Sequence, residues 1–300
     1  MLKKERATTR FRNLMKKPGC IVAPGVADSL AGRLVALAGF DAVYMTGFGT
    51  SLTRLGMPDI GLLTANEMID NANRIVDASG LPVIADADTG YGNPMNVLRT
   101  IRDYEKTGVA GVHLEDQSWP KRCGHLAGKR VIPTAEMVAK LKAACDARND
   151  DDFVIIARTD AIAVEGFDAA IERGHRYREA GADILFIEAP VGREQVEKVT
   201  KAFAGVPLLY NMAASGKTPD IPAEELGRLG FKLAIFPNYA ILAAIPAVQH
   251  MLAELKKTGT IGHLRDRMTT FKEFTEIAGL PEVTKLEARY GVPEDQQAQL

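Results

Sequence analysis

The sequence predicts a (β/α)8 barrel of the TIM type, followed by extra C-terminal helices. Eight short apolar, β-rich runs alternate with longer segments of helical period, which is the pattern of parallel strands joined by helices. A doubly wound open sheet is the competing architecture. It usually has fewer strands and often a glycine-rich phosphate turn after the first one, which residues 24–29 do not supply. We therefore expect a closed barrel.

The expected elements follow in order along the chain. Each expected strand is apolar and bounded by turn-forming residues: 20–25, 41–47, 81–86, 110–116, 153–160, 182–190, 206–211 and 232–237. The segments between them are rich in good helix formers, and several end at a glycine in the usual position after the last turn: 29–39, 66–79, 94–108, 135–148, 167–181, 194–205 and 223–230.

After the eighth strand the chain continues with about 50 residues of mostly helical pattern, about 240–292. A barrel needs only one closing helix, so we expect the surplus to pack on a neighbouring subunit. We treat residues 1–300 as one barrel domain with this extension, because their length fits one large barrel or two ordinary domains.

Composition argues for a small-molecule partner. The formal net charge is -1 from 37 basic and 38 acidic residues, so no global field attracts nucleic acid or an anionic membrane. No segment stays apolar for the roughly 18 residues of a membrane helix, and the N-terminus lacks the apolar core of a signal peptide. Three scattered cysteines favour a reducing compartment. We expect a cytoplasmic protein.

Polar side chains gather where the expected strands end, which is where barrels of this class build active sites. Asp86 and Asp88 lie two residues apart, so in extended backbone both carboxylates face one side of the sheet. Glu115 ends the next strand. Three carboxylates without cysteine or imidazole select a hard cation, Mg²⁺ or Mn²⁺. The alternative is that an aspartate here caps the following helix.

Two further groups suit an anionic substrate. Arg158 ends an apolar strand, where a guanidinium requires an anionic partner; that partner is a substrate carboxylate or, alternatively, Glu188 or Asp160. Residues 44–49 end the second strand with hydroxyls and two glycines, so that backbone amides can approach a carboxylate. Asp59, in the loop that follows, could reach a metal's water shell.

The segment 113–130 contains a basic loop with a cysteine. Lys121, Arg122 and His125 surround Cys123 with positive charge, which lowers a thiol pKa and supports proton transfer or nucleophilic attack. Gly124 gives the backbone freedom to fold over a ligand, as a catalytic lid must. The alternative is a solvated basic loop with an incidental cysteine.

With these residues assembled, the sequence resembles the isocitrate lyase and phosphoenolpyruvate mutase superfamily over essentially its whole length. Seven motifs carry the resemblance: YMTGFG (44–49), DADTGYGN (86–93), GVHLEDQ (111–117), KRCGH (121–125), ARTDA (157–161), EAP (188–190) and YNM (210–212). The resemblance implies a (β/α)8 barrel whose last helix is exchanged between paired subunits, usually in a homotetramer. It also implies magnesium and a 2-oxo or 2-hydroxy acid at the barrel mouth.

The resemblance also implies roles for individual residues. It makes Asp86 and Asp88 the acids nearest the metal, directly or through water, with Asp59 and Glu115 farther out. By the same resemblance, Thr46, Gly47 and Phe48 form the cradle that binds the carboxylate of the oxo acid, and Arg158 is its charged clamp. The groups around a second carboxylate are Gly124, His125, Glu188 and Asn211. Cys123 marks the carbon–carbon lyase branch, where it is a general acid. The general base stays open between Tyr44 and a metal-held water relayed by Asp59.

Several activities remain within this resemblance. Methylisocitrate lyases meet a third substrate carboxylate with arginines from C-terminal helices, whereas this sequence has Leu242 and Phe271 at the corresponding places. An uncompensated carboxylate is costly, so we favour a dicarboxylate and the 2,3-dimethylmalate or 2-alkylmalate lyases, releasing pyruvate and a short acid. The alternatives are 2-methylisocitrate lyase, oxaloacetate hydrolase or decarboxylase, carboxyphosphonoenolpyruvate mutase, and a non-catalytic binding barrel. The oxaloacetate hydrolases tend to carry serine at the position of Pro237, which counts against that activity.

Overall fold

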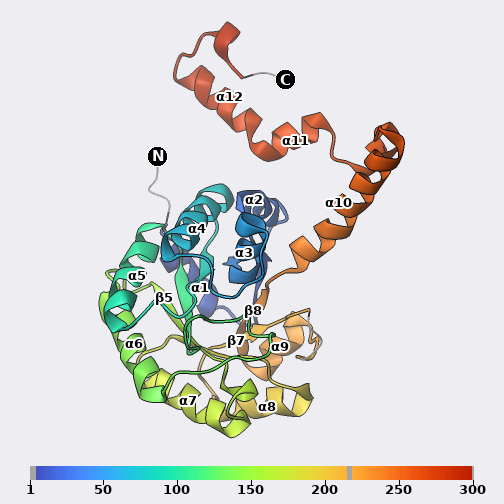
Figure 1. Ribbon diagram of the computed structural model, residues 1–300. Coiled ribbons are helices and arrows are strands. Elements are labelled where there is room, and N and C mark those ends of the chain that lie inside the picture. Colours follow the sequence, from blue (N-terminus) through green and yellow to red (C-terminus); the bar gives the residue numbers. More distant parts are fainter. Residues whose placement is uncertain (1–4, 215–217, 299–300) are drawn as a thin grey trace. The chain divides into compact units, whose positions relative to one another are not determined.

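Eight parallel strands form a closed barrel in the computed structural model, which describes residues 5–214 and 218–298 (Figure 1). Each strand pairs with the next one along the chain, and the eighth pairs with the first. The predicted fold class is confirmed. The strands are β1 (Ile21–Val26), β2 (Val43–Met45), β3 (Val83–Asp86), β4 (Gly111–Glu115), β5 (Val154–Thr159), β6 (Ile184–Ile187), β7 (Leu208–Asn211) and β8 (Phe231–Phe236).

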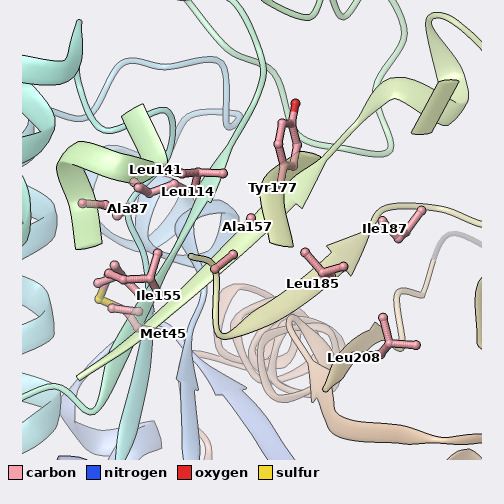
Figure 2. Close-up of a cluster of buried hydrophobic side chains, with 14 of the residues drawn as sticks. Met45, Ala87, Leu114, Leu141, Ile155, Ala157, Tyr177, Leu185, Ile187 and Leu208 are labelled. Atoms are coloured by element: carbon pink, nitrogen blue, oxygen red, sulfur yellow. The ribbon is translucent and has the colours of Figure 1, made fainter. Parts of the chain in front are cut away.

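Alternation along each strand separates two apolar clusters. In β5, Val154 and Ile156 belong to the cluster inside the barrel, whereas Ile155 and Ala157 join the cluster between the strands and the outer helices. Figure 2 shows part of that outer cluster, with Ile155 and Ala157 among its labelled side chains. Because the side-chain period of a strand is two residues, Arg158 returns to the inner side at the point where the barrel opens.

Helices connect the strands and cover the barrel: α1 (Ala7–Lys16), α2 (Ser29–Leu37), α3 (Gly47–Leu55), α4 (Ala65–Ser79), α5 (Pro94–Lys106), α6 (Thr134–Ala147), α7 (Phe167–Glu179), α8 (Gly192–Ala202) and α9 (Ala223–Leu229). Capping fixes several starts; Thr64 and Glu67 form a reciprocal capping box at α4. Two helices were not predicted from the sequence: α1, whose Phe11 joins the inner cluster, and α3, which the Thr46 side chain caps.

The chain divides into two compact units, Met1–Ile241 and Leu242–Leu300, and the boundary falls within α10 (Tyr239–Thr258). The second unit continues with α11 (Phe271–Ala278) and α12 (Leu280–Arg289), so the expected helical extension is present. That the whole chain forms one domain stays a prediction. In the described ranges, no helix is long and apolar enough to cross a membrane.

The backbones of β4 and β5 pack so closely that a side chain added at Gly111 should destabilise the fold. A Cβ added at Gly111 would lie 2.4 Å from the carbonyl oxygen of Val154, so Gly111→Ala should lower the free energy of unfolding by about 1–3 kcal/mol. Gly32→Ala is the matched control, because its Cβ would meet Ile75 at an ordinary 3.4 Å inside α2, and it should stabilise by about 0.5–1 kcal/mol. Urea denaturation measures both. Equal midpoints for Gly111→Ala and the wild type would contradict this packing.

Candidate active site

The inward-facing residues at the carboxyl ends of the strands surround a cavity of about 50 Å³. Twelve predicted site residues line it: Tyr44, Thr46, Phe48, Asp59, Asp86, Lys121, Cys123, Gly124, His125, Arg158, Glu188 and Asn211. Ala213 and Asn238 also line it and were not predicted. The Thr46 hydroxyl donates a hydrogen bond to Asn238 Oδ1 at 3.1 Å. Pro237 completes the lining. Three predicted residues, Gly47, Asp88 and Glu115, lie behind this layer.

Asp86 is the acid of β3 that faces the cavity. Its carboxylate accepts hydrogen bonds from the backbone amides of Gly47, at 3.1 Å, and Asp88, at 2.9 Å. A Cβ on Gly47 would lie 2.4 Å from Asp86 Oδ2, so glycine is required for this approach. Gly47 was expected to offer its amide to a substrate carboxylate; in the structure that amide instead orients Asp86.

Lys121 separates the other two predicted metal-binding aspartates. Its ammonium lies 2.7 Å from Asp59 Oδ1 and 2.7 Å from Asp88 Oδ1, and its side chain is 3% exposed. The expectation that Asp86 and Asp88 share one face of an extended strand was wrong, because β3 ends at Asp86 and Asp88 adopts a left-handed φ of 47°. Burial raises the pKa of Asp88 to about 6, against the opposing effect of Lys121.

Arg158 is buried in a set of three carboxylates. Its Nε lies 2.9 Å from Asp160 Oδ2, its Nη1 3.3 Å from Glu115 Oε2, and its Nη2 3.9 Å from Glu188 Oε1. The ion pairs considered as an alternative from the sequence are therefore present, and the guanidinium also lines the cavity. Fixed by Asp160, it is preorganised to receive a further anion.

The loop between β4 and α6 brings Cys123 to the cavity. The Cys123 amide donates to the carbonyl oxygen of Asp59 at 3.0 Å, and His125 Nε2 lies 3.0 Å from Glu188 Oε1. At Gly124 an added Cβ would lie 2.2 Å from Arg158 Nη2, so only glycine lets the loop approach this closely. The loop thus places a thiol beside the cations and acids of the barrel rim.

The thiol is less acidic than the sequence suggested. Burial raises the pKa of Cys123 to about 11, because removal from water disfavours the thiolate. The expected lowering of this pKa by surrounding positive charge was wrong, since burial outweighs the lowering effects of Arg158 and Lys121. At neutral pH the sulfur keeps its proton, which suits a proton donor better than a nucleophile.

Tyr44 contacts His113, a residue of β4 that was not among the predicted site residues. The Tyr44 hydroxyl lies 2.8 Å from His113 Nε2, and both side chains are buried. Burial raises the pKa of Tyr44 well above its usual range, and the nearby charge of Asp86 raises it further. Tyr44 is therefore a neutral phenol at pH 7. His113 lies two residues before Glu115 on β4, so both side chains face the inside of the barrel. This alternation could have identified His113 from the sequence.

The charges around the cavity are unbalanced. Three cations, Lys121, Lys129 and Arg158, face six carboxylates, at Asp59, Asp86, Asp88, Glu115, Asp160 and Glu188. Burial raises the pKa of Glu115 well above its usual range, so this acid keeps its proton more readily than the others. The remaining excess of negative charge is costly to bury, and admitting a dianionic substrate would cost more. Glu115 Oε1 is also buried without a hydrogen-bond partner.

The donor set suits a divalent cation. Carboxylate oxygens are the ligands that Mg²⁺ and Mn²⁺ prefer, and Mg²⁺ commonly uses one or two of them together with waters and substrate oxygens. Within residues 5–214 and 218–298, no group of three or more His, Cys, Asp or Glu side chains is gathered closely enough to hold a metal by itself. In the same ranges, Asp86 is the acid that lines the cavity without a lysine or arginine ion pair.

Comparison with known proteins agrees with this geometry. The profile of the phosphoenolpyruvate phosphomutase family matches residues 11–256. The chain belongs to this family. All seven motifs that carried the resemblance lie within the matched range, so the family relationship covers the barrel and most of α10.

Two curated members and one solved structure are especially similar. The 2,3-dimethylmalate lyase of Eubacterium barkeri is 47% identical over 94% of this chain and 97% of its own length. A 2-methylisocitrate lyase of Aeropyrum pernix is 40% identical over 95% of this chain and 91% of its own. A crystal structure of 2,3-dimethylmalate lyase superposes with a TM-score of 0.93 at 41% identity, covering 99% of this chain and 100% of that one.

Proposed function

We propose that this protein is a magnesium-dependent carbon–carbon lyase that cleaves a 2-hydroxy dicarboxylate, 2,3-dimethylmalate or another 2-alkylmalate, into pyruvate and a short carboxylic acid. The observation that carries the proposal is that the partly buried Cys123 thiol, whose pKa burial raises to about 11, lines the same cavity as Arg158 and Asp86. A binding barrel would need the cation and the acid, but it would have no use for a proton donor.

The reaction divides among these side chains. The proton of the substrate 2-hydroxyl leaves to a base, the C2–C3 bond breaks, C2 becomes the carbonyl carbon of pyruvate, and C3 becomes the enediolate carbon of the second acid. Arg158 binds the carboxylate retained on the oxo acid. The Cys123 Sγ–H donates its proton to C3 and completes the carboxylic acid. A bound Mg²⁺, held by Asp86, would supply Lewis-acid stabilisation of the developing oxo acid.

Of the two candidate bases, Asp59 fits better than Tyr44. Burial holds the Tyr44 phenol in its neutral form, which is a weak proton acceptor. Asp59 lines the cavity as a carboxylate paired with Lys121 at 2.7 Å, and it could take the proton through a water. Lys121 would then stabilise the carboxylate between turnovers rather than act on the substrate.

The substrate is expected to carry two carboxylates rather than three. Among the described residues, Lys121 and Arg158 are the lysine and arginine side chains that line the cavity, and each is already paired with acids. Leu242 and Phe271 are 47% and 73% exposed and apolar, so neither can compensate a third carboxylate. The 2-alkylmalates meet this limit, whereas 2-methylisocitrate does not.

A substrate panel tests the proposal. We expect pyruvate release from 2,3-dimethylmalate with Mg²⁺ to exceed that from 2-methylisocitrate by about tenfold or more in kcat/KM, since an unpaired carboxylate costs at least about 1–3 kcal/mol. Coupled lactate dehydrogenase measures the rate. A higher kcat/KM for 2-methylisocitrate would reject the interpretation of Leu242 and Phe271, and no release from any malate above a chelated blank would reject the lyase.

We also propose that the assembled protein is a cytoplasmic homotetramer in which α10 is exchanged between paired subunits. None of the α10 residues is buried within the described chain. Its apolar side chains recur at helical spacing and are 39–52% exposed: Leu242, Ile245, Val248, Leu252 and Leu255. Such a stripe on a water-soluble surface is typical of a subunit contact.

A further inference from the structure

The loop that carries Cys123 needs an anchor beyond its two ends. At its base, Gln117 bridges to Val131, and the Gln117 side chain bonds the backbone of Arg122. Farther along, the residues from Leu126 to Gly128 are exposed. The position of the thiol therefore depends on what holds the short turn at residues 123–126.

Lys129 supplies a contact to that turn. Its ammonium donates to the carbonyl oxygen of Gly124 and lies 2.9 Å from Asp160 Oδ1. The Lys129 side chain is 3% exposed although it belongs to a surface loop, and the Asp160 side chain is fully buried. A lysine buried this far is stable only where anionic and carbonyl oxygens compensate for lost water.

The same carboxylate also orients the substrate clamp. Asp160 Oδ2 accepts from Arg158 Nε at 2.9 Å, and Oδ1 accepts from Arg158 Nη2 at 3.2 Å. Lys129, Asp160 and Arg158 thus form a continuous chain of charge-assisted hydrogen bonds from the loop turn to the cavity. If the loop opened, Asp160 would lose one of its two cations.

We propose that Lys129 is a positioning residue that fixes the Cys123–Gly124 turn in the closed loop through Asp160, the carboxylate that also holds Arg158. The proposal deepens the proposed function, because it couples the proton donor to the clamp. Loss of the ammonium would leave the turn held only by the Cys123 amide and His125, and we expect this loosening to expose the thiol while Cys123 and Arg158 stay chemically intact.

Alkylation of the free enzyme tests this positioning without any substrate. In Lys129→Met, iodoacetamide should modify Cys123 about tenfold or more faster than in the wild type, because an opened loop exposes the sulfur to the reagent more often. Mass spectrometry follows each cysteine separately, so Cys20 and Cys145 report on general loosening. Arg130→Met is the matched control, since it removes a positive charge from the next, exposed position.

Turnover gives the second readout. Lys129→Met should lower kcat by about 100-fold with a smaller change in KM, because a displaced proton donor slows the chemical step. Lys129→Arg, which can still reach an acceptor, should recover part of kcat, and Arg130→Met should match the wild type.

The alkylation result decides the proposal. Selective acceleration at Cys123 in Lys129→Met supports it, even if no malate proves to be a substrate and the lyase proposal fails. Unchanged alkylation at Cys123, or equal acceleration at all three cysteines, would overturn it, because the first shows that Lys129 does not hold the turn and the second shows a general structural role.

Discussion

Cys123→Ser should lower kcat for pyruvate release from 2,3-dimethylmalate by about 10²–10⁴-fold, the range that a positioned general acid contributes. The serine hydroxyl is nearly isosteric but is a much weaker acid than a thiol, so the enediolate carbon would lose its proton donor. KM should change little, since Arg158 and Asp86 remain. Steady-state kinetics with saturating Mg²⁺ measures the effect.

Cys145→Ser is the matched control for this substitution. Cys145 lies on α6, where its thiol donates to the carbonyl oxygen of Gly181, and it does not line the cavity. Its replacement should leave kcat unchanged. If Cys123→Ser retained kcat within threefold of the wild type, the sulfur would not be the proton donor, and another group on the cavity wall would have to supply the proton.

Asp86→Asn should weaken divalent-metal binding and lower kcat/KM by about 10²–10³-fold, the equivalent of several kcal/mol of lost electrostatic stabilisation. The amide can still accept a backbone hydrogen bond, but it removes the charge that the cavity offers to a cation. Mn²⁺ affinity measured by electron paramagnetic resonance separates binding from chemistry. This readout needs no substrate.

Asp103→Asn controls for the loss of one negative charge. Asp103 lies on α5 and pairs with Arg99 and Lys106 at the surface, so its replacement should alter neither Mn²⁺ affinity nor turnover. Unchanged Mn²⁺ affinity in Asp86→Asn would contradict the assignment of the metal to this carboxylate and would direct attention to Asp59.

The barrel could be predicted from the sequence because its signals are local. Each strand is an apolar run of the right length, and turn residues separate it from the next helix. Parity along a strand is enough to predict that Arg158 and Asp86 lie at the inner rim. The helix α3 was missed because its start depends on one side-chain cap, at Thr46, within a glycine-rich segment.

The electrostatics of the site could not be predicted in the same way. Lys121 and Asp59 are 62 residues apart in the chain, and their ion pair exists only because the loop folds over the rim. The carboxylate of Asp59 raises the pKa of the Cys123 thiol and so opposes the lowering effect of Lys121. Burial then dominates, and the predicted direction of its thiol pKa was reversed. Similarly, the left-handed φ of Asp88 turns it away from the register of β3.

The most direct test of the central claim is product analysis in D2O with 2,3-dimethylmalate and Mg²⁺. If the reaction breaks C2–C3 and protonates the leaving carbon from an exchangeable thiol, it should yield equal amounts of pyruvate and propionate, with one deuterium at C2 of propionate. Mass spectrometry and nuclear magnetic resonance measure both. Propionate without deuterium would contradict the account, and so would dimethylmalate left intact by an enzyme that forms oxalate and acetate when oxaloacetate is supplied in its place.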